Sequence, residues 1–258
     1  MIKNFIKDSL TCISKDNCFV QKAIGLFLFV MLYSYSQLFA VGLFNIKLPF
    51  WNYAVLSLVV LVVIFIINGY KVACIQGLME QDETTVFPYL NIKKNFRAGI
   101  KYTLAMMVFY IPLFYLLQGF SLLAGFSIAV EHDMLAHFGF PCIVMAGICI
   151  LASIFYNFVC LIGFNRIYCE TENWLSFVKF KELFVLIKSD WKKYLTAVLI
   201  LFVINILNIT LLLGLKSFEL GYLSIVPAAL LALYEFYVKV YVTAKFKGYQ
   251  ADQHQLQA

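Results

Sequence analysis

The sequence YAVLSLVVLVVIFIINGYKVA occupies residues 53–73 and contains a single charged side chain, Lys71. A helix of about 20 such residues, rising ~1.5 Å per residue, spans the ~30 Å hydrocarbon core of a bilayer. Five further runs of similar length and composition occur in the chain, and we interpret each as a transmembrane helix. The six runs cover approximately residues 23–44, 53–73, 102–123, 141–163, 194–215 and 222–244.

The composition excludes an ordinary soluble domain. Hydrophobic residues make up 63% of the 258 residues and charged residues 13%, with a mean hydropathy of +0.86. Soluble domains are roughly 45–50% apolar and roughly 25% charged. We therefore predict an all-α polytopic membrane protein. It forms one membrane domain over residues 1–258, with six transmembrane helices in three hairpins and a short polar tail at 249–258.

The basic residues predict the topology. Of the 20 Lys and Arg residues, all except Lys47 and Lys216 lie in the N-terminal arm, in the second and fourth gaps between runs, at the C-terminal end, or, for Lys71 and Lys239, in the parts of the runs that lead into these segments. Short cytoplasmic loops are enriched in Lys and Arg. We therefore expect both termini in the cytoplasm and the protein in the cytoplasmic (inner) membrane. The same charge distribution accounts for the net charge of +6 without nucleic acid as a partner.

Three segments on the predicted cytoplasmic side have amphipathic periodicity: residues 2–13, 88–100 and 175–190. Each precedes a hairpin, and each is expected to lie as a helix in the head-group layer. In the third segment the apolar face consists of Phe177, Phe180, Phe184 and Ile187. The lipid bilayer is therefore the expected partner, together with other membrane proteins.

The three units of amphipathic segment and hairpin share short sequence similarities. Gly69-Tyr70-Lys71 ends the second run and Gly163-Phe164-Asn165-Arg166 ends the fourth, while Lys101-Tyr102 and Lys193-Tyr194 open the third and fifth. These similarities indicate either a true internal repeat or three independent hairpins of the same composition.

One stretch of the chain is similar to a known family. It contains Gly69-Tyr70, Gly77-Leu78, Pro88, Gly99-Ile100-Lys101 and Tyr110-Ile111-Pro112. In this pattern, over roughly residues 60–200, the chain resembles a family of prokaryotic multi-pass membrane proteins catalogued as a domain of unknown function. The resemblance implies a prokaryotic cell membrane and brings no activity with it.

Glu235 is the acidic residue well inside a predicted span, and an intramembrane ionisable group is a functional hypothesis by default. Lys239 follows at i+4, so the two side chains lie on one helix face. They form either a proton or cation relay or a structural ion pair. We favour the ion pair, because the partner is close and Lys239 can extend towards the inner surface.

Other polar and helix-breaking residues occur within the spans. Pro112 and Pro227 can expose backbone carbonyls to a cation, but proline kinks without such a role are more common. Asn68 and Asn157 can form interhelical hydrogen bonds worth ~0.6 kcal/mol each, enough to orient helices.

We expect no cofactor and no metal. Asp133 and His137 are spaced i,i+4, but no third ligand is placed beside them, and the seven cysteines form no C-x-x-C pair. The chain also has no P-loop, H-E-x-x-H or Rossmann glycine motif. The favoured function is therefore a non-enzymatic integral membrane protein, such as a scaffold or accessory subunit. The alternatives are a small-solute or proton-coupled transporter that uses Glu235 and, with the least support, an enzyme at the lipid interface.

Overall fold

The computed structural model describes residues 2–16, 18–40, 50–80, 87–129, 136–217 and 225–245, and the regular elements in this part of the chain are all helical. The long apolar helices are α2 (Phe19–Ala40), α3 (Phe50–Met79), α4 (Ile92–Ala129), α5 (Ala136–Phe155), α8 (Trp191–Ser217) and α9 (Ile225–Ala244). A π-helical turn, η2 (Tyr156–Cys160), joins α5 to α6 (Leu161–Thr171). The short elements are α1 (Ile2–Leu10), η1 (Cys12–Lys15), η3 (Trp174–Val178) and α7 (Phe180–Ser189).

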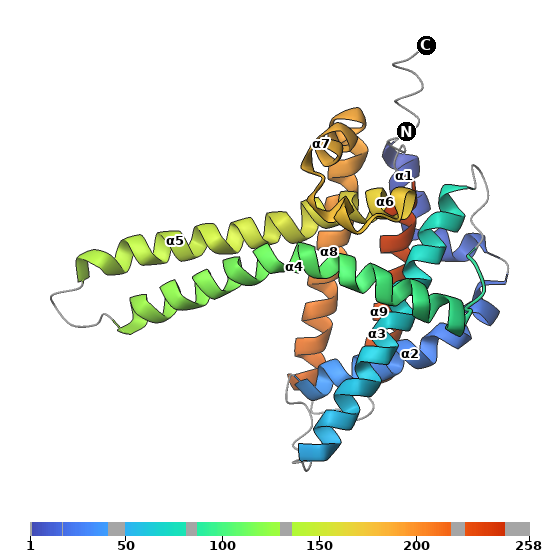
Figure 1. Ribbon diagram of the computed structural model, residues 1–258, viewed down its shortest axis with the longest axis horizontal. Helices are drawn as coiled ribbons and strands as arrows, with labels where there is room; N and C mark the ends of the chain where they lie inside the picture. The colour runs from blue at the N-terminus through green and yellow to red at the C-terminus, as the bar shows by residue number, and fades with distance from the viewer. Residues whose placement is uncertain are drawn as a thin grey trace.

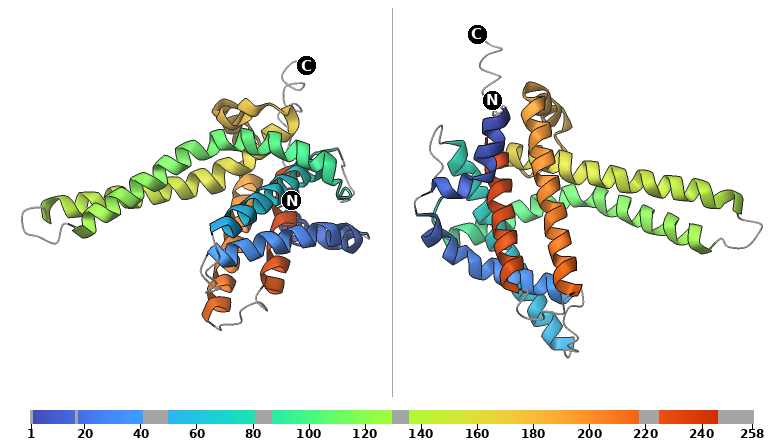
Figure 2. Two further views of the ribbon diagram at one scale, coloured as in Figure 1. Left: turned by 60° about the horizontal axis from the view of Figure 1, so that its bottom comes forward. Right: turned by 180° about the vertical axis from the view of Figure 1, so that it is seen from behind.

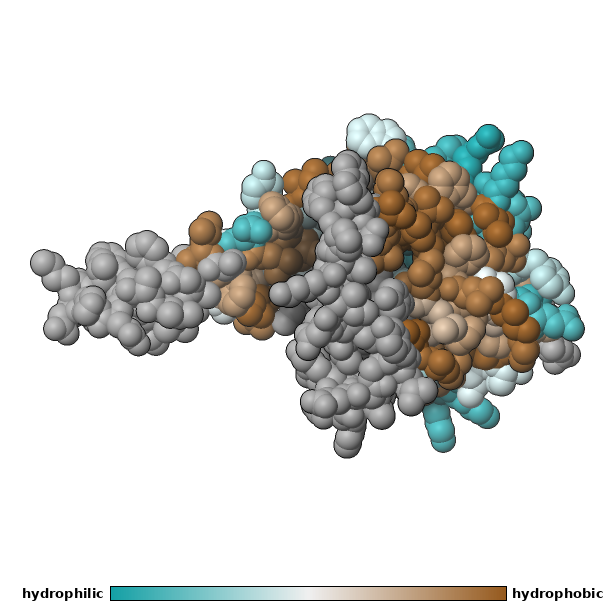
Figure 3. All heavy atoms as spheres, turned by 90° about the horizontal axis from the view of Figure 1, so that it is seen from below, coloured by the Kyte–Doolittle hydropathy of each residue, from teal (hydrophilic) through white to brown (hydrophobic). Residues whose placement is uncertain are grey.

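Four segments of these helices are long and apolar enough to cross a membrane: Val55–Met79, Ile92–Phe120, Trp191–Asn208 and Ile225–Ala244. Phe19–Tyr33 and Val144–Ser153 are shorter apolar helical segments. Large hydrophobic side chains are exposed along all six long helices. Figure 3 shows the resulting broad apolar surface, with hydrophilic residues gathered towards the end opposite the tip of the α4–α5 hairpin. Such a surface is typical of a protein embedded in lipid.

The long helices do not form a parallel bundle. The α4–α5 hairpin projects away from the rest of the molecule and runs across the direction of α8 and α9 (Figures 1 and 2). Both sides of the hairpin contain a helix-bending feature: Pro112 lies inside α4, which continues through it, and the π-helical turn η2 lies between α5 and α6. The two points lie close together, because the rings of Phe109 and Tyr156 stack with centroids 4.3 Å apart.

The amphipathic segments differ in their structures. Residues 2–13 contain α1 and the first two residues of η1, and residues 175–190 contain most of η3 and all of α7. Residues 92–100, by contrast, are the first turns of α4 and continue into its apolar part without a break. The amphipathic periodicity predicted a separate interfacial helix at 88–100. In the structure Gly99, a residue type that often ends helices, lies inside α4, where its missing side chain lets α4 pass close to α3.

An aromatic core lies where the hairpin joins the body. Tyr102, Phe109, Phe164 and Phe177 are fully buried, and their rings contact one another across α4, α6 and η3. Phe177 therefore belongs to this core and does not share the predicted face in the head-group layer. It separates from Phe180, Phe184 and Ile187 because it lies in η3, before α7 begins.

Candidate functional site

The helices α3 and α4 cross at two glycines with their backbones in contact. A Cβ atom on Gly69 would lie 1.7 Å from the carbonyl oxygen of Asn95, and one on Gly99 would lie 1.7 Å from that of Phe65. Beside the crossing, Asn68 Nδ2 donates a hydrogen bond to Thr103 Oγ1 at 3.0 Å. The predicted interhelical role of Asn68 is thus present at this contact. Small residues allow such close approach of membrane helices.

Tyr70, next to Gly69, connects this crossing to α9. Its hydroxyl donates a hydrogen bond to the carbonyl oxygen of Pro88 at 2.8 Å and lies 3.4 Å from the hydroxyl of Tyr237. Both tyrosines are fully buried. Gly69, Tyr70, Pro88 and Gly99, four of the residues that carry the family resemblance, therefore meet at one place in the fold, the α3–α4 crossing and the segment that leads into α4.

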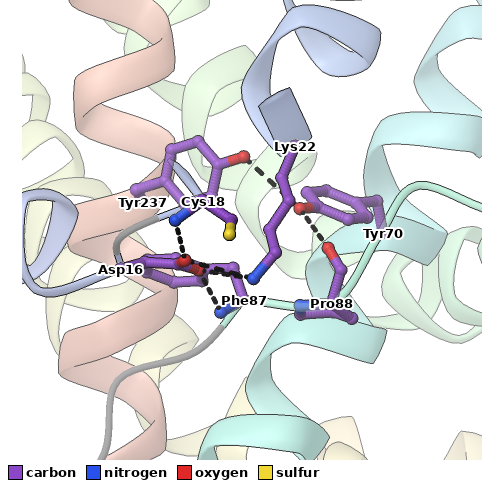
Figure 4. A network of polar contacts seen from close by, with 7 residues as sticks. All are labelled: Asp16, Cys18, Lys22, Tyr70, Phe87, Pro88 and Tyr237. Carbon is purple, nitrogen blue, oxygen red and sulfur yellow. Dashed lines mark hydrogen bonds and ion pairs between the residues drawn. The ribbon is translucent and has the colours of Figure 1, made fainter. Parts of the chain in front are cut away.

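A buried ion pair completes this region (Figure 4). Lys22 Nζ lies 2.8 Å from Asp16 Oδ2, and the side chains of Lys22 and Asp16 are 4% and 3% exposed. The Asp16 carboxylate also accepts hydrogen bonds from the backbone N–H groups of Phe87, at 2.8 Å, and Cys18, at 3.0 Å. The ion pair therefore joins the N-terminal arm and α2 to the segment before α4.

These contacts determine the protonation of Asp16. Burial alone would raise its pKa, but the hydrogen bonds from Lys22, Phe87 and Cys18 together hold the pKa below its usual value. Asp16 is therefore charged at neutral pH. Lys22 is one of the basic residues of the N-terminal arm that predicted the topology, and the sequence signal for the pair is an acid six residues before it, ahead of an apolar run.

A second group of polar contacts joins α3, α4, α6 and α9. Tyr102 accepts a hydrogen bond from Lys71 Nζ at 2.9 Å and donates one to Asn165 Oδ1. Arg166 pairs with Glu170 at 2.7 Å, with both side chains 7% exposed, and it also donates a hydrogen bond to the backbone carbonyl of Ala244. We refer to these contacts, together with the Asp16–Lys22 pair, as the inner polar junction.

Gly163, which the sequence similarities align with Gly69, has a comparable close contact with its own partners. A Cβ atom on Gly163 would lie 2.2 Å from Leu183 Cδ1 in α7, and the Gly163 N–H donates a hydrogen bond to the hydroxyl of Tyr194 at 3.1 Å. Gly69 in α3 and Gly163 in α6 thus both allow close packing against a later helix.

Glu235 forms the ion pair with Lys239 that the i,i+4 spacing predicted. Its second oxygen accepts a hydrogen bond from Asn208 Nδ2 at 2.7 Å, so the carboxylate also links α9 to α8. The Glu235 side chain is 9% exposed, whereas that of Lys239 is 39% exposed. The carboxylate is therefore nearly enclosed, and its charge is balanced within the protein.

The remaining candidates lie apart from one another. Pro112 is an exposed residue in the middle of α4. Pro227 is the third residue of α9, where its missing N–H would have no acceptor in the same helix. Asn157 lies in the π-helical turn η2. The tail at 249–258 and Asp133 fall outside the described residues.

Two buried cysteine thiols are expected to be poor nucleophiles. Burial raises the pKa of both Cys12 and Cys169 to about 12, so both are protonated at neutral pH. Within the described part of the chain, no three His, Cys, Asp or Glu residues gather as a metal site.

Neither the curated proteins nor the solved structures include a match to the chain. A family model matches residues 53–216, which span α3 to most of α8 and include both crossing glycines. The chain therefore belongs to the family described as Protein of unknown function (DUF4013).

Proposed function

We propose that this protein is a non-enzymatic membrane protein of a prokaryotic cytoplasmic membrane, crossing it six times with both termini in the cytoplasm and acting as a scaffold or accessory subunit. The observation that carries the proposal is the pairing of Glu235 with Lys239 and Asn208. The intramembrane acid is used in helix packing, as are the ion pairs of the inner polar junction. In this proposal the exposed apolar surfaces of the helices bind the partner membrane proteins.

Six crossings of one flat bilayer require the α4–α5 hairpin to align with α8 and α9. In the structure it runs across them (Figure 2). Pro112 and η2 lie at the base of the hairpin, and proline and π-turns are positions where helices bend. We assign them the role of bending points that allow this alignment.

The topology has a direct test. A reporter enzyme that is active only outside the cytoplasm should be inactive when fused after Ala258 and active when inserted near His132, because the inner segments hold eighteen basic residues and the outer ones two. Activity would be measured in intact cells, with protein levels checked by immunoblot. The opposite pattern would rule out cytoplasmic termini.

The role of Glu235 has a second test. Glu235→Gln should cost about 1 kcal/mol or less, because the glutamine oxygen can still accept the Asn208 hydrogen bond. Lys239→Met should cost more, about 2 kcal/mol, because it leaves a nearly enclosed carboxylate without its cation. The double variant should be mild. Thermal unfolding of the detergent-solubilised protein measures all three.

The transporter alternative predicts a different result for the same variants. If Glu235 is part of a proton or cation relay, the Glu235→Gln variant should lose proton or cation uptake into proteoliposomes while keeping the thermal stability of the wild type. A specific loss of uptake in that variant would replace the scaffold proposal.

A further inference from the structure

A cavity of about 700 Å³ lies beside the α3–α4 crossing. It is bounded by the end of α3, the segment that leads into α4 and the first turns of α4, with Tyr168 and Glu172 of the α6 end on the far side. The cavity is therefore formed by the elements that carry the family resemblance. It belongs to neither the Glu235 contacts nor the Asp16–Lys22 pair.

The lining of this cavity is strongly basic. Lys93, Lys94, Arg97 and Lys101 contribute to it from successive turns of α4, against two acids, Glu80 and Glu172. All four basic side chains are exposed. Six ion pairs are found within the described residues, and none of them uses these four cations. Glu172 is already engaged, since it accepts a hydrogen bond from Gln76 at 2.9 Å.

Asn95 also lines the cavity, but its side-chain amide is buried behind the cavity wall. The residue is 2% exposed, and its Nδ2 has no hydrogen-bond partner among the described residues. The four cations are therefore the groups that face the cavity, and several basic side chains around one cavity are the arrangement expected where an anion with several acceptor oxygens binds.

We propose that this cavity binds a phosphate group. Arg97 and the lysines supply charge-assisted hydrogen bonds to its oxygens. The phosphate belongs either to the head group of an anionic phospholipid or to a soluble phosphate compound. This inference goes beyond the proposed function and rests on the cavity, so a failed topology test would change the membrane face of the site but not its chemistry.

The test uses the full-length protein in neutral detergent. The variant R97Q/K101Q removes two exposed cations from the cavity, and the matched control K181Q/K188Q removes two exposed cations from α7. Binding of phosphatidylglycerol in mixed micelles is measured by native mass spectrometry, with phosphatidylcholine as the zwitterionic comparison. Inorganic pyrophosphate is titrated at constant ionic strength, with thermal stability as the readout.

We expect phosphatidylglycerol or pyrophosphate to bind R97Q/K101Q at least about tenfold more weakly than the wild type. Binding of the same probe to K181Q/K188Q should equal that of the wild type. Binding of the lipid alone identifies a head-group site, whereas stabilisation by pyrophosphate identifies a soluble phosphate compound. Equal weakening in the two double variants would reduce the effect to general attraction of an anionic surface and would overturn the proposal. Unchanged binding in R97Q/K101Q, or no binding of either probe to the wild type, would also overturn it.

Discussion

The substitution Gly99→Ala is expected to lower the free energy of unfolding by about 3 kcal/mol, a large effect for one methyl group. The added Cβ would lie 1.7 Å from the backbone oxygen of Phe65, and a backbone atom cannot move aside as a flexible side chain can. The helices α3 and α4 must therefore separate, which also disturbs the hydrogen bond between Asn68 and Thr103.

Gly77→Ala on α3 is the matched control. A Cβ at Gly77 would meet no atom within 4 Å, so its midpoint of thermal unfolding should stay the same or rise slightly, because alanine favours helix over glycine. Gly69→Ala should resemble Gly99→Ala, and the double variant should cost less than the sum, because one separation of the helices relieves both clashes. Equal midpoints for Gly99→Ala and Gly77→Ala would show that the backbones do not touch.

Lys22→Met is expected to cost about 3–5 kcal/mol, because it leaves the Asp16 carboxylate buried without its cation. Lys15→Met provides the comparison within the same arm. Lys15 pairs with Asp8 at 2.7 Å, but both side chains are more than a third exposed, so that change should cost at most about 1 kcal/mol. Thermal unfolding in detergent compares the two variants, and similar losses would contradict the buried position of the Asp16–Lys22 pair.

The pair also predicts a response to acid. The pKa of Asp16 is lowered in the folded protein, so its contribution to stability is fully present above its unfolded pKa of ~3.9. That contribution is lost as the pH falls through the lower folded pKa. The double variant Lys22→Met/Asp16→Asn should recover part of the stability lost in Lys22→Met, because it no longer buries an unpaired carboxylate. Below about pH 4 the stability of this double variant should fall less steeply with decreasing pH than that of the wild type.

Local spacing predicted several features well. The lengths of the apolar runs predicted a helical membrane protein, because a bilayer requires a minimum helix length and little else. The i,i+4 spacing placed Glu235 beside Lys239, because residues four apart share a helix face. The predicted membership of an uncharacterised family is confirmed by the family model that matches residues 53–216.

Features that depend on contacts between segments distant in sequence could not be predicted from local spacing. Periodicity at 88–100 is the same for a separate interfacial helix as for the first turns of α4, so it could not show that the helix continues. Phe177 matched the face of Phe180 and Phe184 by spacing, yet a 3₁₀ turn placed it in the aromatic core.

The sequence by itself determined the helical class, the apolar lengths and the local Glu235–Lys239 pair, since each follows from the geometry of one helix in lipid. The tertiary structure alone decided the contacts between elements: the Gly69–Gly99 crossing, the Asp16 carboxylate on the Phe87 N–H, and the basic cavity with Asn95. Their physical basis is the close approach of segments distant in sequence, where a missing methyl group or a buried charge has an effect only because another backbone lies against it.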